Sequence, residues 1–314
     1  MGKDKVQRIV RNAFKILKKS LLNFGSNRPI QLAGTTAFFA IFSTAPILII
    51  IISVFGFFTN DVIIRQKLFD ELNVLVGQES TQLLRDAIDN YQIAKNSDVG
   101  AIIGVVIFLF SATTLFSILQ NSINFIWRIQ AKANVKMGIL NLVKTRILSF
   151  GVILSLGFVL LVSLVIDASI AFLKDFLSHY ISSELIFVAQ IANIILSFGI
   201  ITTVFALIYR FLPDVKVRWN ASWYAAIFAA LLFTGGKFLI GYIIGSSKLG
   251  VVYGAASSFV VILVWIYYVS LIFYFGVELS YQYSRYYGHN NKPMKFAVPF
   301  EINKVQQKDK KRIL

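Results

Sequence analysis

The sequence predicts an all-α polytopic membrane protein that crosses the bilayer six times, with both termini in the cytoplasm. Three observations predict it: an apolar composition, six long apolar stretches, and positive charge that alternates between them. Of the 314 residues, 57% are hydrophobic and 15% are charged, with a mean hydropathy of +0.71. Soluble domains are about 25% charged. The composition therefore indicates that lipid surrounds most of the chain.

Six apolar stretches have the roughly 20 residues that a transmembrane helix needs. Apolar side chains recur around each stretch rather than along one stripe, which is typical of helices in lipid or inside a bundle. They define a membrane domain over residues 29–286. The predicted spans are residues 33–58, 99–119, 147–173, 185–209, 221–245 and 251–279.

Lys and Arg residues between the spans predict the orientation. The N-terminal segment, the second and fourth loops and the C-terminal tail together carry 24 of these residues, and the alternate loops carry 6. Cytoplasmic loops are enriched in Lys and Arg, so this alternation predicts cytoplasmic termini. The formal charge of +16 then faces the anionic inner leaflet. Anionic lipid headgroups are the expected partners, and no nucleic-acid partner is expected, because no nucleic-acid-binding fold is recognised.

The two ends of the chain differ in pattern. Residues 1–28 alternate apolar and basic positions at helical spacing, which predicts an amphipathic helix in the cytoplasmic interface. A solvated basic arm is the alternative. No removable signal peptide is expected at this end. The tail, residues 287–314, is basic and poor in apolar residues, so we expect it to be disordered.

The loop 59–98 is long and acidic, with seven acidic residues against four basic ones. Apolar residues share one helical face before Gly77 and another face after it, which predicts an outer helical hairpin. Loops of this length are uncommon without a role, so a protein partner at residues 59–98 is a hypothesis.

Charged groups inside the spans are costly and are therefore candidate site residues. Lys237 and Asp167 fall at similar depths in the fifth and third spans, where they could line a polar cavity or contact substrate. A structural ion pair, or two side chains that reach the outer interface, is the alternative. Arg210 and Glu278 both end spans at the inner face, as a structural pair or an inner gate.

Other residues are candidates for hinges, packing or capping. Pro46 in the first span removes one helical hydrogen bond, and its kink is either a hinge or a fixed shape. Gln120, Asn121 and Asn124 are interpreted as interfacial capping groups. The pairs Gly241 with Gly245 and Gly250 with Gly254 fit a Gly-x-x-x-Gly pattern, which would let helices approach closely, and Gly236 is a further candidate for a hinge or for packing.

The residue inventory argues against an enzyme. The chain has no cysteine, and its two histidines, His179 and His289, lie outside the spans. A membrane serine hydrolase would therefore lack its base. Metal-protease, Walker A and dinucleotide motifs are absent, so no metal and no cofactor are expected.

Three segments together resemble the YihY/virulence factor BrkB family, members of which carry an old and mistaken label as ribonuclease BN. These segments begin at Leu32, Arg210 and Tyr253, and the last reads YGAASSFVVILVWIYYVSLIFYFGVELS. The resemblance implies a multi-pass protein of the bacterial plasma (inner) membrane with six spans. It adds Trp265 and Tyr268 to the candidate packing residues. Ser280 departs from the family pattern, in which asparagine is typical.

Three functional hypotheses follow. The leading one is a cell-envelope protein that transports, or helps to translocate, a lipid or another amphiphile. The second is a non-catalytic membrane scaffold that docks envelope proteins. The third is a small-solute channel, which would require a continuous water path and is more easily built by an oligomer.

Overall fold

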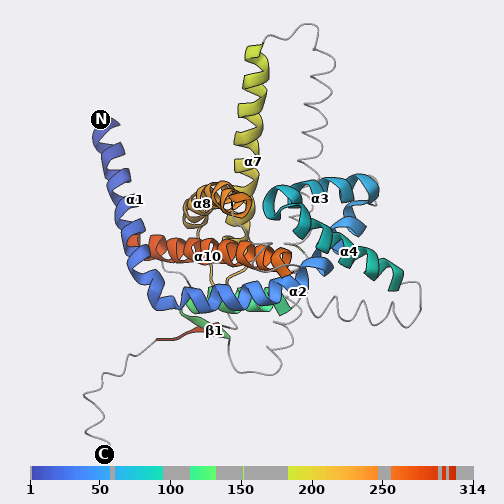
Figure 1. The fold of residues 1–314 in the computed structure, drawn as a ribbon. Helices are drawn as coiled ribbons and strands as arrows, with labels where there is room; N and C mark the ends of the chain where they lie inside the picture. The colour runs from blue at the N-terminus through green and yellow to red at the C-terminus, as the bar shows by residue number, and fades with distance from the viewer. Residues whose placement is uncertain are drawn as a thin grey trace, which may run out of the picture.

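The computed structural model describes residues 2–56, 61–94, 114–131, 151, 183–246, 256–288, 292–294 and 297–301. Helices dominate these residues, and two short strands accompany them (Figure 1). Residues 114–126 are also helical. The elements are α1 (Gly2–Phe24), the 3₁₀ turn η1 (Gly25–Asn27), α2 (Pro29–Gly56), α3 (Asp61–Val76), α4 (Gln78–Ala94), β1 (Ile129–Ala131), α7 (Ser183–Phe211), α8 (Trp219–Ser246), α10 (Ser257–Tyr286) and β2 (Ala297–Pro299).

Helix α10 is the central element of the described fold. It packs most extensively against α2 and α8 and also contacts α1, α7, α3 and α4 (Figure 1). The nine successive residues from Ile272 to Ser280 are all buried. A helix that packs on one side buries only a stripe, so this run shows that neighbouring elements enclose the C-terminal half of α10.

Four helices lie where the sequence predicts apolar spans. Within the described residues, three segments are long and apolar enough to cross a bilayer: Pro29–Ile49, Trp219–Ile240 and Ser257–Tyr286. In α7, Ile195–Phe211 forms a shorter apolar segment. The predicted spans 99–119 and 147–173 fall largely outside the described residues. The full set of six spans and the cytoplasmic termini stay predictions.

Helix α1 forms over the N-terminal amphipathic segment and packs against the bundle on one face. Ile16 is buried, and the ring of Phe24 packs edge-on against Phe275 of α10 at 5.3 Å between centroids. The Tyr224 hydroxyl of α8 donates to the Ala13 carbonyl at 3.0 Å. The solvated-arm alternative is therefore wrong, because this segment is a helix packed against the protein. Its place in the bilayer interface stays a prediction.

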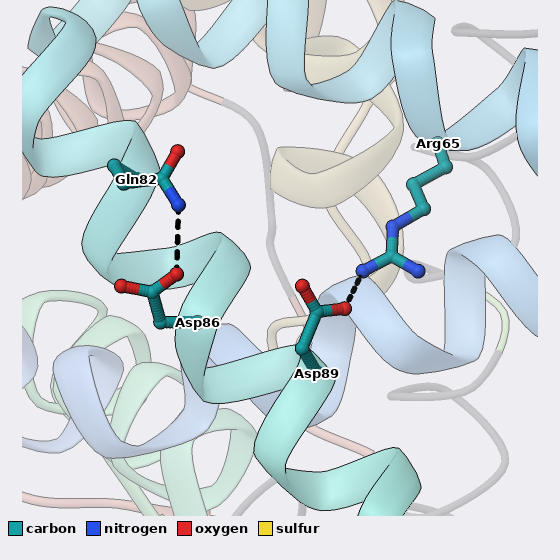
Figure 2. Close-up of polar contacts among 4 residues, drawn as sticks. All are labelled: Arg65, Gln82, Asp86 and Asp89. Carbon is teal, nitrogen blue, oxygen red and sulfur yellow. Dashed lines mark hydrogen bonds and ion pairs between the residues drawn. The ribbon is translucent and has the colours of Figure 1, made fainter.

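Helices α3 and α4 are separated at Gly77, as the sequence predicts. Gly77 has a φ of +83°, a conformation that glycine adopts without steric cost. Arg65 of α3 forms an ion pair with Asp89 of α4, whereas Gln82 and Asp86 bond within α4 (Figure 2). The pair of helices is thus held together through side chains. Its location outside the bilayer stays a prediction.

The C-terminal part of the chain departs from one expectation. The described residues are mostly helical, as an all-α fold requires, and β1 and β2 add a short antiparallel pair in which Gln130 is opposite Val298. The tail is not disordered throughout, because residues 292–294 and 297–301 pack against the protein. The Phe300 amide donates to the Arg128 carbonyl at 3.0 Å, and Ala297 is buried. Main-chain pairing does not require apolar side chains, so composition alone could not reveal this contact.

Candidate functional site

The carboxyl group of Glu278 is the centre of a buried polar cluster at the C-terminal end of α10. Glu278 is 1% exposed. Its Oε2 atom accepts a hydrogen bond of 2.6 Å from Nδ2 of Asn27, and its Oε1 atom accepts one of 2.7 Å from Nε2 of Gln282. Gln282 reaches the carboxyl because residues four apart lie on one helical face. Both carboxyl oxygens are therefore bonded by neutral amides.

Asn27 joins three parts of the chain at this cluster. It ends η1, between α1 and α2, and its Oδ1 atom accepts a 2.8 Å bond from Nη2 of Arg128. The next residue, Arg28, has a φ of +53°, which is uncommon for a residue other than glycine. We call Gly25–Arg28 the α1–α2 elbow. Its position is tied to α10 through Glu278 and to the segment before β1 through Arg128.

The predicted pairing of Arg210 with Glu278 is wrong. The Arg210 guanidinium lies over the ring of Trp219, with 5.5 Å between its central carbon and the ring centroid. The guanidinium groups that act electrostatically on the Glu278 carboxyl are those of Arg128 and Arg285. The positions of Arg210 and Glu278 in their spans predict a common depth in the membrane but not the rotation of each helix about its axis. Depth alone therefore could not identify the partner of Glu278.

A second buried polar cluster surrounds Asp214, in the connection between α7 and α8. Asp214 is 5% exposed, and its carboxylate accepts bonds from Gln120 at 3.0 Å and Asn124 at 2.8 Å. The Asn124 side chain also accepts from the Asp214 amide at 2.9 Å. The Asp214 carbonyl accepts from the amide of Met294. Gln120 and Asn124 are therefore not interfacial caps. They hold the α7–α8 connection, and the C-terminal segment covers it.

Two tyrosine–glycine contacts bring α10 close to its neighbours. The ring of Tyr268 fills the space that a side chain on Gly236 would need, and its hydroxyl donates to the Leu232 carbonyl of α8 at 2.9 Å. In the same way, Tyr209 of α7 lies against Gly276, and its hydroxyl donates to the Phe273 carbonyl of α10 at 3.1 Å. Each contact combines close backbone approach with a hydrogen bond between helices.

The remaining packing candidates fall in different places. Trp265 is buried and packs edge-on against Phe233 of α8 at 5.7 Å. Helix α2 continues through Pro46 without a break. Gly241 and Gly245 lie in the last turns of α8. Gly254 lies outside the described residues.

The structure does not test the predicted pairing of Lys237 with Asp167. Lys237 lies in α8 with its side chain partly exposed. Asp167 falls outside the described residues, so the proposed pair stays a hypothesis. Among the residues that the structure describes, no three His, Asp or Glu side chains gather where they could hold a metal ion.

Comparison with known proteins identifies the family. The sequence profile named Virulence factor BrkB matches residues 21–298, which include the elbow, α10 and both polar clusters. The chain belongs to the virulence factor BrkB family. A UPF0761 membrane protein of Haemophilus influenzae is 24% identical to this BrkB-family chain over 263 residues, which cover 82% of the chain and 90% of that protein. A UPF0761 membrane protein of Idiomarina loihiensis is 28% identical over 71% of the chain and 73% of its own length.

These relatives are membrane proteins of bacteria, and the apolar helices of this BrkB-family chain agree with a bacterial membrane location. No solved structure matches the chain significantly. The names of the family and of these relatives specify neither a reaction nor a ligand. The role of the site must therefore be inferred from the chemistry of its residues. Glu278 and Asp214 are each bonded by amides, an arrangement that can hold a carboxyl group in a fixed position inside a protein.

Proposed function

We propose that this BrkB-family protein transports, or helps to translocate, a lipid or another amphiphile at the bacterial inner membrane, without a catalytic step. The observation that supports the proposal is the outward surface of α1. Apolar side chains are exposed there beside ammonium groups: Phe14 is 66% and Leu22 is 73% exposed. We define the α1 outer surface by Phe14, Lys15, Lys18, Lys19, Leu21 and Leu22, all of which are exposed.

A surface of this composition is suited to the lipid headgroup region. Apolar side chains insert at the boundary between headgroups and acyl chains, and lysines there attract anionic lipids. Each Lys near an anionic surface contributes about 1 kcal/mol to membrane attraction. The opposite face of α1 packs against α10, and the turn that follows α1 carries Asn27 to the Glu278 cluster. A lipid-binding surface and a buried polar cluster thus lie on adjoining elements.

Transfer of fluorescent lipids in reconstituted vesicles tests the proposal. We expect the protein to accelerate transfer of anionic lipids more than of zwitterionic lipids. The triple variant Lys15→Gln, Lys18→Gln and Lys19→Gln is expected to lose this headgroup preference. A control variant, Lys216→Gln with Arg218→Gln and Lys292→Gln, removes the same charge from other exposed positions and should keep the preference. Lipid transfer no faster than in protein-free vesicles would rule the function out.

The scaffold is the second candidate, and α3 and α4 support it. Val62, Ile63 and Val74 of α3 and Leu83 of α4 are exposed apolar residues. Photo-crosslinkers at these positions would capture one protein partner if the chain is a scaffold, and Lys237→Ala would leave that capture unchanged. Crosslinks to lipid alone would exclude the scaffold and favour the amphiphile hypothesis.

A further inference from the structure

We propose that Glu278 binds and releases a proton, and that its proton occupancy sets how firmly the α1–α2 elbow is held against α10. The ligand of this site is the proton itself. The inference does not depend on which substrate the protein carries, so it can hold or fail independently of lipid transfer.

The surroundings of Glu278 permit both protonation states. A buried carboxylate ordinarily has a cation in direct contact. Here, among the described residues, no Lys or Arg lies within ion-pair distance of Glu278, and two neutral amides bond its oxygens instead. Arg128 acts on the carboxyl from beyond Asn27, and Arg285 acts from the exposed end of α10. The ionised form is thus supported by hydrogen bonds and by distant charge, without a fixed counter-ion.

Gln282 can serve either protonation state. Its Nε2 atom donates to Oε1 of Glu278, while its own Oε1 atom is buried and has no hydrogen-bond partner in the described structure. A half-turn of the Gln282 amide would place that oxygen against the carboxyl. A protonated Glu278 could then donate its O–H to Gln282, whereas the ionised form accepts the N–H. An amide is both donor and acceptor, so the cluster can accommodate proton uptake without leaving the carboxyl unbonded.

Asn27 links the protonation state of Glu278 to the α1–α2 elbow. The bond from Nδ2 of Asn27 to Oε2 of Glu278 links positions 251 residues apart. A hydrogen bond to an ionised carboxylate is roughly twice as strong as one between neutral groups. Protonation therefore weakens the contact that holds Asn27. Because Arg28 next to it has an unfavourable positive φ, the elbow depends on such tertiary contacts to keep its shape. Proton uptake is expected to loosen the elbow.

Infrared difference spectroscopy of the full-length protein in lipid nanodiscs, between alkaline and acidic buffer, tests the proton site. We expect a carbonyl band of a protonated, buried carboxyl group that grows on acidification and shifts in protein labelled with ¹³C-glutamate. The band should be absent from Glu278→Gln and present in Glu301→Gln, which removes an exposed carboxyl group. A titrating band that shifts with ¹³C-glutamate and persists in Glu278→Gln, or no such glutamate band in the wild type, would overturn the proposal.

Asn27→Ala tests the coupling and does not require Glu278→Gln to fold. Loss of one donor to the ionised form should move the midpoint of the glutamate band to higher pH by about one unit. In the wild type, amide exchange at Gly25–Arg28, corrected for intrinsic rates, should be faster in the protonated state by about tenfold. An unmoved midpoint in Asn27→Ala, or an elbow that exchanges equally in both states, would refute the coupling.

Discussion

The phenol ring of Tyr268 lies directly over the backbone of Gly236, and its hydroxyl donates to the carbonyl of Leu232, one helical turn earlier in α8. A Cβ atom added at Gly236 would overlap the ring. The closeness of α8 and α10 at this level therefore depends on a glycine. The same geometry occurs between Tyr209 and Gly276, where α7 meets α10.

Gly236→Ala should destabilise the protein by about 1–3 kcal/mol, because the new methyl group forces Tyr268 away from α8. Gly235→Ala is the matched control, since no atom of the described residues lies within 4 Å of the methyl group that it adds. This control should be neutral or stabilising by up to about 1 kcal/mol through helix propensity. Unfolding in mixed detergent micelles measures both changes, and equal stability of the two variants would refute the close approach.

Gly276→Ala should likewise destabilise the α7–α10 contact, and it should cost less when Tyr209 is already shortened to Phe. The Tyr209 hydroxyl is the atom nearest to the added methyl group. Tyr209→Phe alone should cost about 1 kcal/mol for the lost bond to Phe273. A double-mutant cycle checks this expectation. Gly199→Ala on α7 is the control, because the methyl group that it adds meets no neighbour in the part of the chain that the structure describes. Strictly additive changes in the free energy of unfolding would contradict the contact between Tyr209 and Gly276.

Asp214→Asn should cost about 1–3 kcal/mol, because an N–H₂ group replaces one of the two oxygens and cannot accept the bond that Gln120 or Asn124 donates to that position. Asp86→Asn is the control: Asp86 is exposed, and among the described residues its carboxylate bonds only Gln82 of the same helix (Figure 2). Its effect should stay within about 0.5 kcal/mol. Thermal unfolding of the purified variants measures both effects on stability. An Asp214→Asn variant as stable as the wild type would mean that the cluster around Asp214 does not stabilise the fold.

A cysteine pair tests the docking of the C-terminal segment, because the chain has no cysteine of its own. Gln130→Cys with Val298→Cys joins directly opposed residues of β1 and β2. Such residues lie about 4.5–5.5 Å apart between Cα atoms, within reach of a disulfide. We expect rapid oxidation in native membranes. The control pair Gln130→Cys with Glu301→Cys lies three residues out of register, roughly 10 Å further along, and should oxidise slowly. Equal rates would indicate that the segment is not paired.

The sequence predicted the elements that hydropathy controls. The predicted spans 185–209 and 221–245 lie within α7 (Ser183–Phe211) and α8 (Trp219–Ser246), because long apolar runs in lipid must satisfy their backbone as helices. The break at Gly77 was also predictable, since the apolar face changes there and glycine tolerates positive φ.

The candidate site was only half predictable. Glu278 was identified because a charge inside a span is costly, but its partners depend on helix rotation and on a turn 251 residues away. Gln120 and Asn124 carried a signal in their spacing, because residues four apart share a helical face. Their partner, Asp214, lies in a connection whose path the sequence does not specify. The docked C-terminal segment gave no signal in the hydropathy pattern, since the hydrogen bonds that hold it are made by main-chain atoms.

The bond between Asn27 and Glu278 is the contact on which this account of the site most depends, and a double-mutant cycle with Asn27→Ala and Glu278→Met measures it directly. The free energy of unfolding of the wild type, both single variants and the double variant gives the coupling energy. We predict a favourable coupling of about 1.5–3 kcal/mol, as for a hydrogen bond to a charged group. A coupling within about 0.5 kcal/mol of zero would contradict a cluster that ties the α1–α2 elbow to α10.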